Sequence, residues 1–129
     1  MLIGGILNPA INSLLGRVRH TNTLVIADRG FPFWPQIETI DISLVDDIPQ
    51  VMDVLLAIRG NFSIGRVFAA QEFLAVNKPE TTSALENNLL GIPITWEPHD
   101  DLKKRVPQAI GLIRTGDTTQ YANLILESA

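Results

Sequence analysis

The sequence predicts an α/β fold: a single three-layer α/β/α domain over residues 1–129 with a mixed β-sheet. Segments with helical and with strand-like hydrophobic patterns alternate along the chain, which is the order that puts helices on the faces of one sheet. A length of 129 residues suits one substantial core, and the chain contains no repeat, low-complexity tract or linker. The last two strand-like segments are joined by a short connection around Gly116, which predicts an antiparallel hairpin and hence a mixed sheet.

Four segments carry the signals of helices. Asn8 and Pro9 begin the first helix as its cap and first-turn proline, and apolar residues then recur at helical spacing. Pro49 precedes the second helix and Pro79 opens the third; both end at a glycine, and the last helix has two acids in its first turn. The expected helices run from residue 9 to about 19 or 20, from 50 to 59, from 79 to 90 and from 100 to 106.

The strand-like segments differ in their expected burial. The continuous apolar run Leu24–Ala27 is typical of a strand buried on both faces, whereas Ile37–Ile42 alternates only in part. The Ala-Ala-Gln-Glu part of residues 66–73 also fits a helix, and Met1–Leu7 fits either a buried first strand or an N-terminal arm. The expected strands span residues 24–27, 37–42, 66–73, 92–97, 109–114 and 121–127.

Composition excludes several classes of protein. The net charge of −4 is dispersed, without the clustered Lys and Arg of a nucleic-acid-binding surface. The chain has no cysteine, which excludes disulfides and thiolate sites and fits a reducing cytoplasm. The apolar start is short and ends at Asn8-Pro9, so neither a signal peptide nor a membrane-spanning segment is expected. No Walker loop, GxGxxG, HExxH or GxSxG motif is present.

Tyr121 and Asn123 are candidate ligand-binding residues. On the expected last strand they point the same way, because side chains alternate between the faces of a strand. A phenol beside a carboxamide is an uncharged donor and acceptor pair that suits a ligand rich in hydroxyl groups. Taken alone, these residues favour a simpler interpretation, in which Tyr121 covers an apolar surface and Asn123 is a polar residue at a strand edge.

His20, Asp28 and His99 are candidates for acid–base chemistry. His20 follows the expected end of a helix, where the helix dipole favours the imidazolium form, although it also fits a plain capping residue. Asp28 ends a strand, and ligands collect beyond the carboxyl ends of strands in open α/β sheets; a turn-forming Asp is the alternative. His99 precedes a helix and fits a surface residue near its cap. If both histidines reached one cavity, one could donate a proton while the other accepted one.

Phe31, Phe33 and Trp34 place three aromatic residues in one short, proline-rich loop. Such an apolar cluster needs cover. It could stack on a sugar, line a subunit contact or fold back over the core, and of these we expect the subunit contact.

The segment His20–Pro32, His-Thr-Asn-Thr-Leu-Val-Ile-Ala-Asp-Arg-Gly-Phe-Pro, resembles the signature of the D-ribose pyranase family, also called the RbsD/FucU sugar mutarotases. Shorter matches occur in the family's order across nearly the whole chain. They are Leu7-Asn8, His99-Asp100, Ile113-Arg114-Thr115-Gly116-Asp117 and Tyr121-Ala122-Asn123.

The resemblance implies an RbsD-like fold and a cofactor-independent isomerase that interconverts the ring forms or anomers of a monosaccharide by acid/base ring opening. It implies that His20 is the general acid, that Asp28 and His99 are substrate-binding or catalytic, and that Tyr121 and Asn123 contact the sugar. It also implies a ring-shaped homo-oligomer, commonly a decamer, with sites near subunit contacts. No metal, nucleic-acid or membrane partner is expected, and the expected location is the cytoplasm.

The chain departs from the ribose-type pattern in bulk and charge. Asn22 replaces the usual Asp, Arg29 replaces a small residue, and Phe33-Trp34 is bulkier than the usual pair. Gly4-Gly5 lies where many members have a basic residue. Two alternatives therefore stay open: a mutarotase for another sugar such as fucose, and a non-catalytic sugar-binding or transport-associated protein. Pairing of Arg29 with Asp28 would favour the second, but we expect Arg29 to turn outwards or into an interface.

Overall fold

The computed structural model describes residues 1–129, and six strands form one sheet. The helices are α1 (Pro9–Arg17), α2 (Val51–Arg59), α3 (Gln71–Val76), α4 (Pro79–Leu89), α5 (His99–Arg105) and the 3-10 turn η1 (Val106–Gln108). The strands are β1 (Thr23–Ala27), β2 (Glu38–Asp41), β3 (Ile64–Ala70), β4 (Ile94–Glu97), β5 (Gly111–Arg114) and β6 (Leu124–Ser128).

The sheet is mixed, in the order β2-β5-β1-β6-β3-β4. β1 pairs in parallel with β5 and antiparallel with β6, so β6 runs opposite to every other strand. The predicted hairpin is wrong, because β5 and β6 lie on the two sides of β1 instead of beside each other. The segment between them crosses the carboxyl end of β1, where the Thr115 N–H donates to the Ala27 carbonyl at 2.9 Å.

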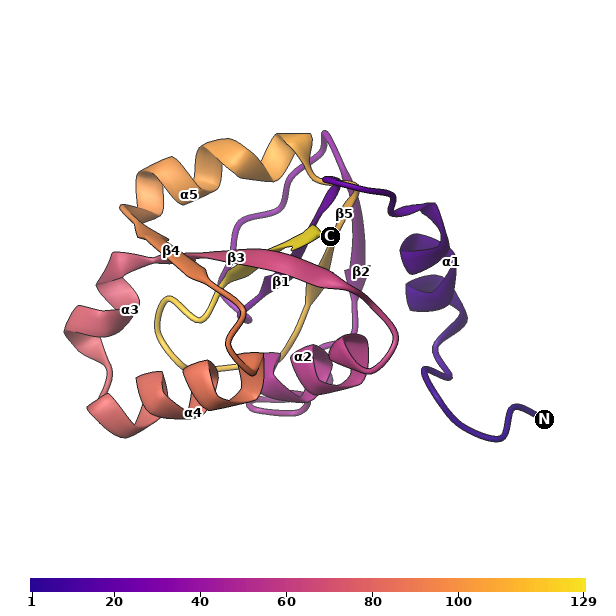
Figure 1. The fold of residues 1–129 in the computed structure, drawn as a ribbon, viewed down its shortest axis with the longest axis horizontal. Coiled ribbons are helices and arrows are strands. Elements are labelled where there is room, and N and C mark those ends of the chain that lie inside the picture. Colours follow the sequence, from indigo (N-terminus) through magenta and orange to yellow (C-terminus); the bar gives the residue numbers. More distant parts are fainter.

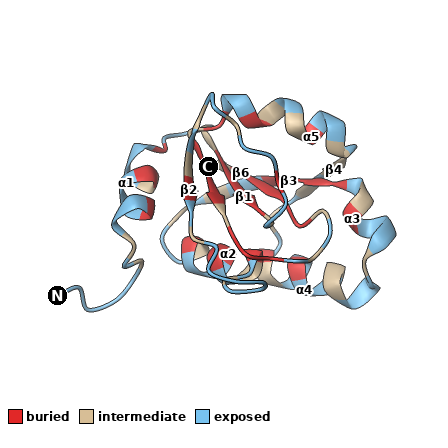
Figure 2. Ribbon diagram, turned by 180° about the vertical axis from the view of Figure 1, so that it is seen from behind, coloured by how far each residue is buried: buried red, intermediate tan, exposed pale blue.

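Helices cover both faces of the sheet, as predicted. Figure 1 shows α5 on one side of the strands and α2 and α4 on the other. Side chains of β1 alternate between two cores: Leu24 and Ile26 pack towards α1, α2 and α4, whereas Val25 and Ala27 pack towards α5. All four are fully buried, and Figure 2 shows burial concentrated on the strands and the inner sides of the helices. The prediction of a strand buried on both faces is therefore confirmed.

Some boundaries differ from the prediction. Residues expected as one strand over 66–73 divide into β3 and α3, so the helical alternative for the Gln-Glu part is correct. Met1–Leu7 forms no strand and extends from the body as an exposed arm (Figures 1 and 2). β6 begins at Leu124, which leaves Tyr121 and Asn123 outside the strand on which they were predicted. None of the helices is both long enough and apolar enough to cross a membrane.

Candidate functional site

Strand directions bring four of the five predicted residues to one edge of the sheet. Asp28 follows β1 and His99 follows β4, while Tyr121 and Asn123 precede β6. Because β1 and β4 run one way and β6 runs the other, the carboxyl ends of the first two meet the amino end of the third. These four residues line a cavity of about 440 Å³ together with Gly30, Phe31, Pro32 and Gln120.

His20 does not join this cavity within one chain. It lies in an exposed turn before β1, whereas Asp28 lies after that strand. A strand of five residues separates the two ends by roughly 16 Å at about 3.3 Å per residue. The two histidines of a single chain therefore do not face one another across the cavity.

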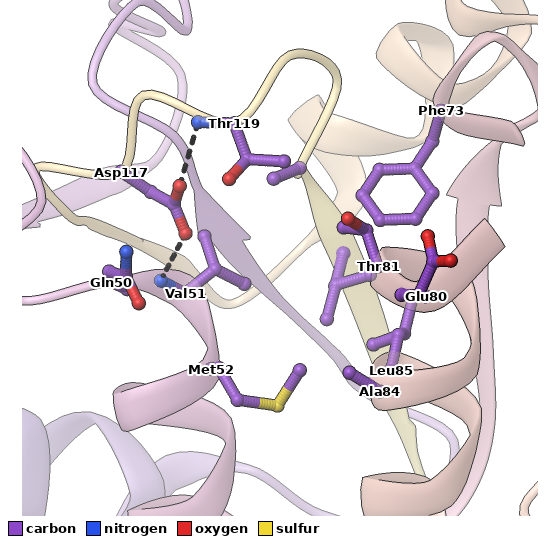
Figure 3. A pocket seen from close by; sticks show the side chains of 12 residues that line it. Gln50, Val51, Met52, Phe73, Glu80, Thr81, Ala84, Leu85, Asp117 and Thr119 are labelled. Carbon is purple, nitrogen blue, oxygen red and sulfur yellow. Dashed lines mark hydrogen bonds between the residues drawn. The ribbon is translucent and has the colours of Figure 1, made fainter. Parts of the chain in front are cut away.

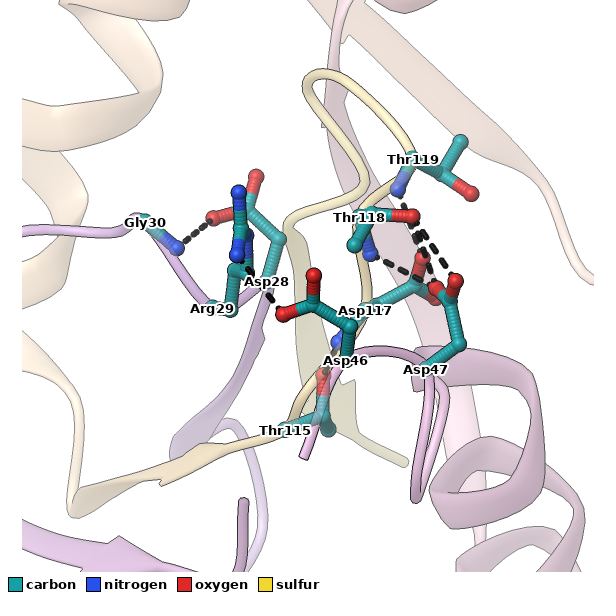
Figure 4. A network of polar contacts seen from close by, with 9 residues as sticks. All are labelled: Asp28, Arg29, Gly30, Asp46, Asp47, Thr115, Asp117, Thr118 and Thr119. Carbon is teal, nitrogen blue, oxygen red and sulfur yellow. Dashed lines mark hydrogen bonds and ion pairs between the residues drawn. The ribbon is translucent and has the colours of Figure 1, made fainter. Parts of the chain in front are cut away.

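Asn123 holds the Asp28 carboxylate in a fixed orientation. Its Oδ1 accepts the Asp28 N–H at 2.8 Å, and its Nδ2 donates to Asp28 Oδ2 at 3.1 Å. The Gly30 N–H donates to Asp28 Oδ1 at 3.0 Å, as Figure 4 shows. Asn123 is only 2% exposed. Its carboxamide is therefore engaged mainly with Asp28 instead of forming a strand-face pair with Tyr121, so that expectation was wrong.

Burial raises the pKa of Asp28 above its ordinary value of 3.8, and the negative charge of Asp117 adds to the rise. The hydrogen bonds from Gly30, Asn123 and Phe31 act in the opposite direction but do not cancel it. The folded chain therefore holds the Asp28 proton more tightly than the unfolded chain does. The tighter binding of this proton stabilises the folded chain. The stabilisation is complete below about pH 3.8 and is lost as the pH rises through the raised pKa of Asp28.

We expect a ¹³C carboxyl titration by NMR to place the Asp28 midpoint above 3.8, because burial disfavours the carboxylate. Asp41 and Asp47 provide internal comparisons. Their pKa values are lowered, first by the Ser43 hydroxyl and by the Thr118 N–H respectively. An Asp28 midpoint at or below those of Asp41 and Asp47 would contradict the assignment.

Aromatic edges enclose the His99 ring. Its centroid lies 5.1 Å from that of Tyr121 and 6.1 Å from that of Phe31, both in edge-on geometry. Phe31 is buried in the core between the sheet and α5, so this residue folds back over the core of its own chain. Trp34 is partly buried and its ring centroid lies 6.2 Å from that of Phe31, whereas Phe33 is 69% exposed. The expected subunit contact stays a prediction for Phe33 and Trp34.

The loop that carries Tyr121 is strained and anchored. Tyr121 has φ +58°, and the Asn123 N–H donates to its carbonyl at 2.8 Å. A left-handed tyrosine costs on the order of 1–3 kcal/mol and persists only where its surroundings impose it. Asp117 supplies such an anchor: it is buried and accepts from the Val51 and Thr119 N–H groups, both at 2.8 Å (Figure 3).

Asp47 is a second anchor of this loop, and no motif in the sequence singled it out. Its carboxylate accepts from the N–H and the hydroxyl of Thr118 at 2.9 and 2.8 Å (Figure 4). Hydrogen bonds between loops far apart in sequence have no local signature. The family matches at Asp117 and at Tyr121-Ala122-Asn123 pointed to this loop, but neither pointed to Asp47.

Arg29 turns away from Asp28, as expected. Its guanidinium pairs with Asp46 at 2.6 Å, and both side chains are more than half exposed (Figure 4). Its backbone N–H donates to the Asp117 carbonyl at 3.1 Å. The Asp28 carboxylate therefore has no guanidinium partner.

A second cavity of about 400 Å³ lies between α2 and α4 (Figure 3). It is lined largely by apolar side chains, including Met52, Phe73 and Leu85, and both oxygens of its Asp117 are already hydrogen-bonded. This cavity also has polar side chains in its lining, but it contains none of the five predicted site residues, whereas the Asp28 cavity contains four of them. The Asp28 cavity is therefore the candidate site. No three histidine, aspartate or glutamate residues gather as metal ligands.

Comparison with known proteins agrees with the motifs. Residues 1–129 match the RbsD / FucU transport protein family. The chain is 39% identical to the D-ribose pyranase of Geobacillus kaustophilus, over 96% of this chain and 90% of that protein. It is 40% identical to the D-ribose pyranase of Bacillus licheniformis, over 96% and 94%.

Solved structures show the same fold. Bacillus subtilis RbsD complexed with D-ribose superposes with a TM-score of 0.93 at 34% identity, over 100% of this chain and 98% of that one. The fucose mutarotase of Streptococcus pneumoniae, in complex with L-fucose, superposes with a TM-score of 0.77 at 20% identity, over 95% and 93%. The latter likeness concerns the fold alone. The chain belongs to the RbsD/FucU family.

Proposed function

We propose that this chain is a cofactor-independent isomerase that interconverts the ring forms or anomers of a monosaccharide, with D-ribose as the first candidate. The observation that carries the proposal is the cavity at the sheet edge, where an oriented carboxylate, an imidazole and a phenol surround space for one small sugar. The related D-ribose pyranases and the ribose complex of RbsD support the choice of sugar.

The chemistry needs only proton transfers. Ring opening removes the proton of the anomeric hydroxyl and gives a proton to the ring oxygen. Reclosure through another hydroxyl changes the ring size, and reclosure on the other carbonyl face changes the anomer. Asp28, His99 and Tyr121 can hold the hydroxyls and exchange protons with them, and the raised pKa of Asp28 brings its proton exchange closer to neutral pH.

A second copy of the chain would complete the site. His20 and the Asp28 cavity lie at opposite ends of β1, so a His20 that reaches the cavity comes from a neighbouring subunit. A contact between opposite ends of identical chains is head-to-tail, and it closes into a ring when the rotation between neighbouring subunits divides a full turn. Phe33 in the loop after β1 and Leu44 and Val45 in the loop after β2 are exposed and would supply apolar contact area. We accordingly propose a cytoplasmic homo-oligomer of single-domain subunits, a decamer by family likeness.

Of the alternatives, a mutarotase for another sugar remains the runner-up, because nothing in the cavity selects ribose over a related aldose. The non-catalytic alternative loses its main argument. It depended on Arg29 occupying the Asp28 carboxylate, and Arg29 pairs with Asp46 instead.

Saturation-transfer NMR with a panel of aldoses tests the proposal. We expect the protein to accelerate pyranose–furanose exchange of D-ribose by at least about 10²-fold, the usual scale of acid–base catalysis. Arg29→Ala should retain this exchange, since Arg29 faces away from the cavity. Acceleration for L-fucose alone would favour the other-sugar alternative. Sugar binding without acceleration for any aldose would establish the non-catalytic one.

A further inference from the structure

We propose that Glu72, in the first turn of α3, is a positioning residue for the sugar site and acts through the backbone of His99. The inference rests on the proposed function, which assigns His99 to the site. It adds a residue that lies outside the cavity lining.

Sheet register brings the two residues together. β3 and β4 pair in parallel with Ala70 opposite Glu97. α3 begins directly after β3, and α5 begins just after β4. Glu72 and His99 each lie two residues beyond this pair, so their separation is set by the rigid end of the sheet.

The start of α5 depends on Glu72. The first N–H groups of a helix have no partner within the helix, and the cap residue here is Pro98, which has no side-chain acceptor. The His99 N–H instead donates to both carboxylate oxygens of Glu72, at 3.1 and 3.0 Å. A charged acceptor makes such a hydrogen bond stronger than a neutral one.

Glu72 is itself held firmly. The next residue, Phe73, is buried and stacks on Trp96 of β4 with ring centroids 6.0 Å apart and planes 23° apart. α3 is thus packed against the same strand that leads to His99.

The His99 ring has no polar restraint of its own. Its Nδ1 is buried without a hydrogen-bond partner, and its neighbours are the edges of Phe31 and Tyr121. The ring's position therefore follows from aromatic packing and from where the backbone of residue 99 is fixed. Small displacements of a group that binds a reacting substrate weaken its action strongly.

The test is Glu72→Ala, with Glu72→Gln as the conservative variant. In Glu72→Ala we expect hydrogen exchange of the His99 amide to accelerate about tenfold and the KM for ribose to rise about tenfold, with a smaller change in kcat. Glu72→Gln keeps a carbonyl acceptor, so its amide exchange and its KM should both lie close to the wild-type values. The amide measurement needs no sugar, so it stays informative if the wild-type chain interconverts no aldose; the Kd for ribose then replaces KM.

Lys104→Gln is the matched control for general loosening of α5. Lys104 pairs with Asp101 within the helix at 3.2 Å and bonds neither to Glu97 nor to the His99 N–H. We expect this variant to leave the His99 amide and KM unchanged. An equal rise in KM for Lys104→Gln, or unchanged KM and amide exchange in Glu72→Ala, would overturn the positioning role.

Discussion

His20→Ala should reduce ring interconversion by roughly 10²-fold or more, because the family resemblance assigns His20 as the group that gives a proton to the ring oxygen. The fold should be unaffected, since His20 lies in an exposed turn before β1. Saturation-transfer NMR measures the exchange rate, and circular dichroism with hydrodynamic mass checks fold and assembly. Unchanged exchange in a correctly assembled variant would remove His20 from the mechanism.

The same variant tests whether two subunits share a site. His20→Ala and Asp28→Ala chains should each be nearly inactive alone. Unfolded together and reassembled in equal amounts, they should recover about one quarter of wild-type exchange, because about one contact in four joins an intact His20 to an intact cavity. If mixing restored nothing while mixed assemblies formed, each chain would supply its own complete site, contrary to the position of His20 before β1.

Gly116→Ala should destabilise the protein by about 2–3 kcal/mol, the cost of overpacking where the neighbours cannot move. A Cβ there would collide with the carbonyl oxygen of Val45 and lie 3.0 Å from that of Ile48. Both oxygens belong to the backbone. The segment that carries them is held against Gly116, because the Gly116 N–H donates to the Pro49 carbonyl at 2.9 Å. Urea denaturation at one fixed protein concentration measures the effect, since the stability of the proposed oligomer would depend on concentration.

Gly16→Ala is the matched control. Gly16 lies in α1 with nothing within 4 Å of its Cβ position. The same chemical change should there stabilise the protein by about 0.5–1 kcal/mol through helix propensity. Equal effects at both glycines would show that the loop over residue 116 adapts freely.

Local signals predicted the elements well where local physics determines them. Asn8 caps α1 through its Oδ1, which accepts the Ile11 N–H at 3.0 Å. Leu24–Ala27 is buried at each position, because both faces of β1 are covered by helices. The hairpin prediction failed because a glycine turn does not reveal which strand edges remain open. Both edges of β1 were open, and β5 and β6 occupy one each.

The candidate site was predictable in part. Asp28 and His99 follow strands that run the same way. The expectation that ligands bind beyond the carboxyl ends of strands therefore places both residues at one site. Tyr121 was misplaced because its alternating pattern is typical of a strand, whereas distant anchors hold it at φ +58°. His20 and Asp28 are close in sequence, but the extended strand β1 forms between them and places them at its opposite ends.

The sheet order also determines when the protein can fold during synthesis. β1 comprises residues 23–27, yet both of its partners lie in residues 111–128. Such long-range pairing is slow, since a large loop must close before any contact forms. A nascent chain would therefore expose Leu24–Ala27, one of its most apolar segments, for most of its time on the ribosome. During that interval the unpaired β1 is a natural binding segment for chaperones and a starting point for aggregation.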